Sequence, residues 1–235
     1  RFNKRLIDKA NLAELTALAS EARNFHYRFT LPWSDRGQRI LPSELFLDYQ
    51  QGLAAIKVKF FKARDSFLAK YPQLVQDART RLGTMYNPGD YPEPSRLLSS
   101  FDMTTEIMPV PDAFDFRVNV DSETQDAIRA QITEAVAAKQ HKAVKDCWAR
   151  AREILERISV QCGNTKGRIH DSLMENAQDL VNLLKGLNIT NDPQITAMER
   201  DIAALIVPTT AIRVSQATRK RVADGAANIL ASMPA

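Results

Sequence analysis

The stretch LFLDYQQGLAAIKVKFFKARDSFLAKYPQLVQDARTRL, residues 45–82, decides the fold predicted for this chain. Its large apolar residues are separated by ten steps of three or four residues that cover 37 positions, an average of 3.7. This period is that of an amphipathic helix with one buried face. The apolar positions are Leu45, Tyr49, Leu53, Ile56, Phe60, Ala63, Phe67, Tyr71, Leu74, Ala78 and Leu82. Pro72 predicts a kink, or a junction between two helices stacked nearly end to end.

A face of this length needs an equally long partner, and a second stripe between Ile128 and Ile158 is the obvious one. It predicts a helix from about 121 to 161, weakest where Gln140 and His141 occupy apolar positions. Paired with the first helix, it gives a hairpin with legs of about 55 Å, at 1.5 Å per residue. The sequence therefore predicts a mainly α fold, an elongated bundle or coiled coil built on a long antiparallel helical hairpin.

The rest of the chain reads as further helices and one insertion of different composition. Helices are predicted over residues 2–22, 167–187, 193–206 and 211–231. Residues 84–126 hold nine acidic residues and two basic ones, a net charge of −7. Within them, Thr105–Val110 and Phe114–Val120 are predicted as two short strands. We therefore expect a single helical domain over residues 1–235, with an acidic, proline-rich α/β insertion at about 84–120 and a basic C-terminal helix at about 209–231.

The motifs of common enzymes are missing from the 235 residues. The sequence contains no phosphate-binding loop, no GxSxG and no HExxH. His141 and Cys147 lie six positions apart on one predicted helix and so face different ways. A carboxylate cluster at Asp112–Asp126 leaves a metal-dependent hydrolase as a third, weaker hypothesis. The sequence therefore predicts a protein that is not an enzyme and has no cofactor and no metal.

Composition predicts a cytoplasmic protein. Cys147 and Cys162 lie fifteen positions apart on one predicted helix, about 22 Å, which is too far for a disulfide. Two unpaired thiols are typical of a reducing compartment. No apolar run approaches the roughly 18 residues that a membrane span requires, so no membrane is expected.

The acidic insertion is the predicted site of partner contact, because it carries aromatic side chains among acids and prolines. The residues assigned to partner binding are Tyr91, Phe101, Asp112, Phe114, Asp115, Phe116 and Arg117. The helices besides the hairpin need not cover both of its long sides, which leaves room for a homo-oligomer.

Nucleic-acid binding is the alternative function, because the net charge is +4 and basic residues gather on two helices. The residues of this alternative are Lys139, Lys142, Lys145, Arg213, Arg219, Lys220 and Arg221. The alternation of aromatic and basic residues between Phe25 and Trp33 could add base stacking. Basic residues interleaved with acids are, however, commonly a solvated helix face.

Several strings in the chain resemble an uncharacterised family of bacteriophages and bacteria, domain-of-unknown-function family 3150. They are LPWSDRGQRILP (31–42), FLAKYPQL (67–74), LGTMYNPGDYP (82–92), PVPDAFDFRV (109–118) and NLLKGLNITNDP (182–193). The resemblance covers about residues 20–206 and leaves out 207–235. Members of the family are expected beside genes for a MoxR or cobaltochelatase-like AAA+ ATPase and a von Willebrand factor A-type protein. The resemblance therefore implies an accessory or adaptor subunit for such an ATPase, with no catalytic residues to transfer.

Overall fold

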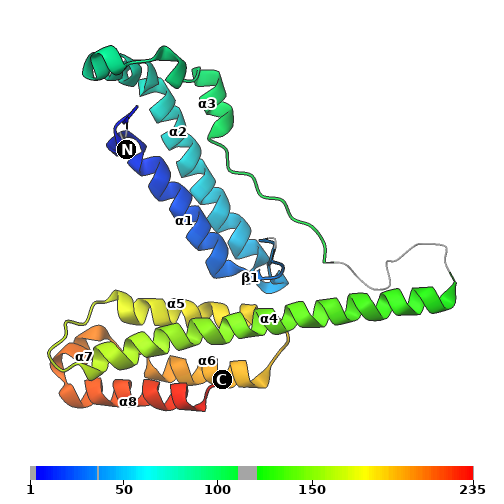
Figure 1. Ribbon diagram of the computed structural model, residues 1–235. Helices are drawn as coiled ribbons and strands as arrows, with labels where there is room; N and C mark the ends of the chain where they lie inside the picture. The colour runs from blue at the N-terminus through cyan, green and yellow to red at the C-terminus, as the bar shows by residue number, and fades with distance from the viewer. Residues whose placement is uncertain (1–3, 36, 111–120, 235) are drawn as a thin grey trace. The chain divides into compact units, whose positions relative to one another are not determined.

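The computed structural model describes residues 4–35, 37–110 and 121–234, and 76% of the structure is helical (Figure 1). The predicted mainly α fold is confirmed. Its α-helices are α1 (Ala13–Phe29), α2 (Phe46–Leu82), α3 (Pro94–Ser100), α4 (Ser122–Gly163), α5 (Ser172–Leu187), α6 (Pro193–Leu205), α7 (Thr209–Val214) and α8 (Gln216–Ser232). Its short elements are β1 (Leu31–Pro32), β2 (Arg39–Ile40) and the 3₁₀ helices η1 (Lys9–Leu12), η2 (Ser43–Leu45), η3 (Gly83–Met85) and η4 (Pro88–Asp90).

The chain divides into two compact units, where the sequence predicted one domain. The first unit is Arg1–Arg28 with Leu47–Pro109, and the second is Phe29–Phe46 with Val110–Ala235. The predicted acidic insertion is split between them, because the division falls after Pro109.

In the first unit, α2 is one continuous helix with Pro72 inside it, and it buries the face that its period predicts. Helix α1 runs antiparallel beside it (Figure 1). The ring of Phe25 stacks on Tyr49 at 5.8 Å, and Lys59 lies 3.6 Å from Glu21. The core shared by the two helices consists of Leu15, Leu18, Phe60, Ala63, Phe67 and Tyr71.

The partner predicted for the α2 stripe has to be corrected. Helices α2 and α4 belong to different units, and each buries its stripe within its own unit. The period of a stripe shows which face is buried but carries no information about what covers it. Helix α1 is the α-helix that directly precedes α2 in the chain, and helices consecutive in sequence usually pack together.

In the second unit, α4 packs against α8, α5 and α6 (Figure 1). The side chains of α4 that are buried all come from its second half: Ala143, Cys147, Ala151, Leu155, Ile158 and Cys162. In the first half of α4, Ile128, Ile132 and Val136 are only half-buried. The helix begins at Asp121, whose carboxylate accepts a hydrogen bond from the Thr124 amide at 2.8 Å.

The two-stranded sheet of the described residues lies at a different place from the one predicted. It pairs β1 with β2 antiparallel, with Leu31 opposite Ile40, and it packs on α4. Arg150 of α4 donates a hydrogen bond to the Thr30 carbonyl at 2.6 Å. Thr105–Val110, predicted as a strand, has no regular structure. The second predicted strand, Phe114–Val120, lies outside the described residues.

The predicted C-terminal helix is two helices. Ser215 separates α7 from α8, and its hydroxyl caps α8 by accepting a hydrogen bond from the Thr218 amide at 3.1 Å. A serine with extended backbone before a helix is a favourable cap, which explains the break.

Candidate partner-binding pocket

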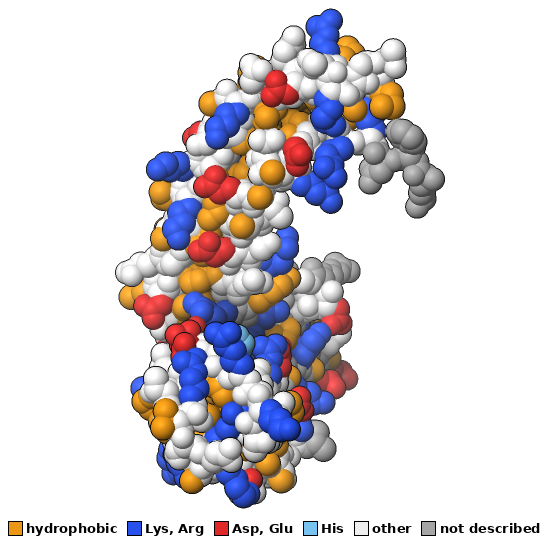
Figure 2. Space-filling model, turned by 90° about the vertical axis from the view of Figure 1, so that its left-hand side faces the viewer, with side chains coloured by type: hydrophobic (Ala, Val, Ile, Leu, Met, Phe, Trp, Pro, Cys, Tyr) orange, Lys and Arg blue, Asp and Glu red, His pale blue; other side chains and the backbone are white. Residues whose placement is uncertain are grey.

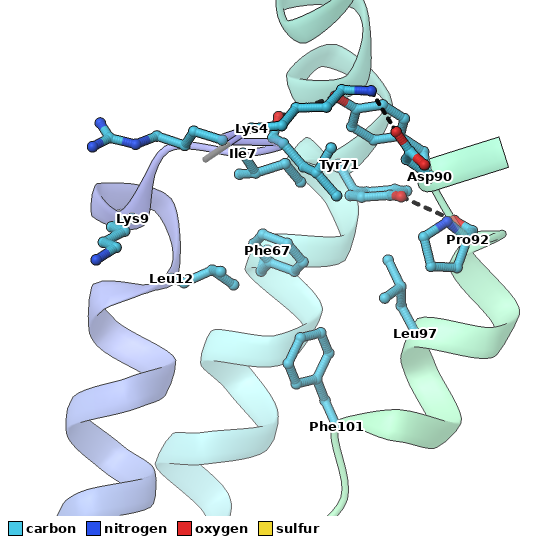
Figure 3. A pocket seen from close by; sticks show the side chains of 13 residues that line it. Lys4, Ile7, Lys9, Leu12, Phe67, Tyr71, Asp90, Pro92, Leu97 and Phe101 are labelled. Carbon is cyan, nitrogen blue, oxygen red and sulfur yellow. Dashed lines mark hydrogen bonds and ion pairs between the residues drawn. The ribbon is translucent and has the colours of Figure 1, made fainter. Parts of the chain in front are cut away.

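The first unit contains a pocket of about 480 Å³ that opens at the surface (Figure 3). Three segments form its walls: the N-terminal segment from Lys4 to Leu12, one turn of α2 with Phe67 and Tyr71, and the chain from Asp90 to Phe101. We call this cavity the first-unit pocket. Its volume is within the range of pockets that bind small ligands or the side chains of a partner.

The interior of the first-unit pocket is apolar. Ile7 and Leu12 line one side, and Leu97 and Phe101 line the other (Figure 3). The Phe101 ring meets the Phe67 ring edge-on at 5.7 Å between centroids. Aromatic pairs in this geometry hold their positions well, so the floor of the pocket is formed in advance of any ligand.

Hydrogen bonds from two tyrosines tie the three walls together. Tyr71 on α2 donates to the Pro92 carbonyl at 3.0 Å, and Tyr91 donates to the Leu6 carbonyl at 3.1 Å. Burial raises the pKa of Tyr71, so its hydroxyl keeps the proton that it donates. The walls are therefore linked by bonds independent of the apolar contacts.

The rim of the first-unit pocket is cationic. Lys4, Arg5 and Lys9 line it with one carboxylate, Asp90, a net charge of +2. Lys4 pairs with Asp90 across the top at 2.6 Å (Figure 3). Arg81 donates to the Arg5 carbonyl at 3.0 Å, which holds the N-terminal segment in place. An apolar group flanked by negative charge suits such a site best.

Two of the predicted partner-binding residues, Tyr91 and Phe101, line this pocket. Both are half-buried and hold its walls, and Tyr91 also stacks on Tyr86 at 5.3 Å. The remaining five lie outside the described residues: Asp112, Phe114, Asp115, Phe116 and Arg117.

The N-terminal wall was missed because the sequence predicts one helix over residues 2–22. The structure begins α1 at Ala13 and places η1 before it. Asp8, which caps η1 by accepting from the Ala10 amide at 3.1 Å, is the signal that could have located this break.

On α4, two of the three lysines assigned to nucleic-acid binding contact the β1–β2 connection. Lys139 lies over the Trp33 ring, 5.6 Å from its centroid, and Lys142 pairs with Asp35. The hydrogen bond from Lys142 lowers the pKa of Asp35. Lys145 is exposed. Lys139 and Lys142 are therefore engaged with the β1–β2 connection, although the Lys142–Asp35 pair is exposed to solvent.

The strongest difference from the sequence-based assignment concerns Arg219, which is only 8% exposed. Its guanidinium donates to the Gln161 carbonyl at 3.0 Å, the Cys162 carbonyl at 3.1 Å and the Gly167 carbonyl at 2.8 Å, and also to the Asn164 carbonyl. These carbonyls belong to the last turn of α4 and the loop that follows. Arg219 thus closes the C-terminal end of α4 and presents no charge to a phosphate.

Two of the other three cations of α7 and α8, Arg213 and Lys220, are also engaged with the chain. Arg213 donates to the Ile169 carbonyl at 3.0 Å and pairs with Asp171 at 2.9 Å. Lys220 pairs with Asp224 at 2.6 Å, and Arg221 is exposed. On the face shown in Figure 2, Lys and Arg side chains are interspersed with acidic and apolar ones.

The thiols are buried in the second unit. Burial raises the pKa of Cys147 to about 12 and also raises the pKa of Cys162. His141, the imidazole nearest to Cys147 in sequence, is exposed. Among the described residues, no group of three His, Cys, Asp or Glu side chains is placed to hold a metal ion. Within the same residues, no helix is both long and apolar enough for a membrane span.

Comparisons of the chain with protein-family models, with curated proteins and with solved structures found no match. The resemblance to family 3150 therefore stays a prediction.

Proposed function

We propose that this chain is a non-enzymatic interaction protein that binds a partner protein through the first-unit pocket. The observation that carries the proposal is the combination of an apolar interior, already assembled, with a cationic rim. Interfaces draw most of their energy from a few apolar or aromatic side chains that enter such pockets, with charges at the edge that orient the partner.

The size of the pocket sets the scale of the contact. A cavity of about 480 Å³ is large enough for more than one apolar side chain. Burial of each Leu, Ile, Met or Phe contributes about 1.5–3 kcal/mol. Rim charges exposed to water add less than about 1 kcal/mol each and act mainly on the rate of association.

We further propose an AAA+ ATPase of the MoxR or cobaltochelatase-like type as a partner, in a bacterial cell that carries phage genes. This part of the proposal is supported by the resemblance to family 3150. Nucleic-acid binding receives less support, because Lys139, Lys142, Arg213 and Arg219 contact other parts of the same chain.

Two neighbouring leucines on α3 provide a matched test. Leu97 lines the pocket, whereas Leu98 does not line it and is 45% exposed. The chain is co-expressed with the MoxR-type ATPase of the same genome, and the affinity of the purified pair is measured by calorimetry. We expect Leu97→Glu to weaken the complex at least tenfold and Leu98→Glu to leave it unchanged.

A second variant distinguishes weaker binding from loss of folding. Arg5 and Lys9 are exposed, so R5E/K9E should keep the thermal unfolding midpoint of the wild type while it reverses the rim charge. A complex that both pocket variants leave intact, or the absence of any complex with the ATPase, would contradict the proposal.

A further inference from the structure

The segment that follows α3 exposes apolar side chains next to acids. Residues 102–109 have the sequence DMTTEIMP and no regular structure after Asp102. Ile107 is 54% exposed and Met108 is 58% exposed. The two charged residues of the segment are Asp102 and Glu106. We call residues 102–109 the acidic-apolar segment.

The acidic-apolar segment and the first-unit pocket complement each other in charge and character. The segment carries −2, with Asp102 at its fixed start and Glu106 in the exposed part, and the lining of the pocket carries +2. Neighbouring side chains of an extended chain point in opposite directions, so Ile107 can enter a pocket while Glu106, one position away, stays outside its apolar interior. Opposite charges around an apolar centre are the usual arrangement at a specific interface.

The segment does not occupy the pocket of its own chain, because every side chain from Thr104 to Pro109 is exposed. Its start is fixed: Phe101 lines the pocket, and Met103 packs against the same core. To turn back, the chain would have to reverse within TTEIM, which contains none of the Gly, Pro, Asn or Asp residues that favour tight turns.

We propose that the first-unit pocket of one copy binds the acidic-apolar segment of a second copy. The inference rests on the proposed function, because it assigns a further occupant to the same pocket. Each copy carries both the pocket and the segment, so two copies can contact each other through the same pair of surfaces. The contact is small, so the association is weak and depends on protein concentration.

Self-association is measured by sedimentation equilibrium over a range of micromolar concentrations. The wild type should rise above the monomer mass of 26.4 kDa. Ile107→Ser with Met108→Ser should weaken association at least tenfold, as should R5E/K9E at the rim. The control K62E/K70E makes the same charge change at exposed positions of α2 that do not line the pocket, and should associate like the wild type.

A charge exchange gives the decisive comparison. The variants R5E/K9E and D102K/E106K should each associate poorly alone, and their mixture should recover association, because an acidic rim then meets a basic segment. A wild type that stays at 26.4 kDa throughout, or a mixture that recovers nothing, overturns the inference. If such a monomer still binds the ATPase through the pocket, the proposed function stands and only the second copy is excluded as the partner.

Discussion

Replacement of Arg219 by methionine should destabilise the second unit strongly and leave the first unit unaffected. Methionine fills a similar volume but provides no donors. Arg219 is 8% exposed, and its guanidinium reaches carbonyls at four positions, of which Cys162 and Gly167 lie at 3.1 and 2.8 Å. A hydrogen bond from a charged group contributes about 1.5–3 kcal/mol, and each buried acceptor left without a partner costs about 1–3 kcal/mol. We expect a loss of about 3–5 kcal/mol in the free energy of unfolding.

The distribution of fluorophores lets this loss be assigned to one unit. Both tryptophans, Trp33 and Trp148, lie in the second unit. All five tyrosines lie in the first unit: Tyr27, Tyr49, Tyr71, Tyr86 and Tyr91. Urea unfolding followed by tryptophan emission therefore reports the second unit. With a urea slope of about 2 kcal/mol per M, the midpoint should fall by about 1.5–2.5 M.

Two companion variants complete this test. Arg221→Met removes the same charge from an exposed position of α8 and should change stability by less than about 0.5 kcal/mol. Arg219→Lys keeps the charge but loses the planar fork and should fall between the two. A loss below about 1 kcal/mol for Arg219→Met would refute the view that this side chain closes the end of α4.

Three further outcomes concern the second unit. Gly225→Ala should lower the free energy of unfolding of this unit by about 1 kcal/mol in a urea titration, because the new Cβ would lie 2.5 Å from the side chain of Leu205 on α6. Gly163→Ala is the control: its Cβ would have nothing within 4 Å, so the change should be neutral or stabilising. Cys147, with a pKa of about 12, should resist a thiol reagent at pH 8 in the native protein and react after unfolding in urea; rapid native labelling would contradict its burial. The hydrogen bond from Thr209 lowers the pKa of Asp171, so the contribution of this carboxylate is present above about pH 4 and lost as the pH falls through the lowered pKa. Asp171→Asn should therefore remove part of the acid-induced loss of stability, and an unchanged acid titration would argue against that bond.

The sequence predicts the helices better than their partners. The stripe of residues 45–82 locates α2 almost to the residue, and the helix predicted from about 121 to 161 matches α4 within two residues at each end. Both follow from local signals, since a helix period depends on neighbours within a few positions. The pairing of stripes depends on contacts between distant segments, which a period does not contain.

The burial of Arg219 could have been predicted from its position in the sequence. This residue lies three residues before Val222 and seven before Ala226, both buried, so it occupies the apolar phase of α8. A charged side chain at a buried position of a helix needs hydrogen-bond partners that are buried with it. Its carbonyl partners come from the last turn of α4 and the loop after it, more than fifty residues earlier, and no pattern in the sequence identifies them.

Two of the residues that line the first-unit pocket, Tyr91 and Phe101, were singled out from the sequence as aromatic residues in an acidic setting. The N-terminal wall was not, because its apolar residues also fit the helix predicted over residues 2–22 and the cap at Asp8 was not recognised.

The interleaving of the two units has a consequence for synthesis on the ribosome. All residues of the first unit are made by Pro109, whereas Phe29–Phe46 belongs to a unit whose other residues begin at Val110. Leu45 packs against Gly186, about 140 residues later. At about 5–20 residues per second, residues 29–46 wait roughly 7–30 s for that helix to emerge. A nascent chain therefore holds a finished first unit beside an unpaired segment containing Trp33, and a chaperone that binds this segment would set the yield of the second unit.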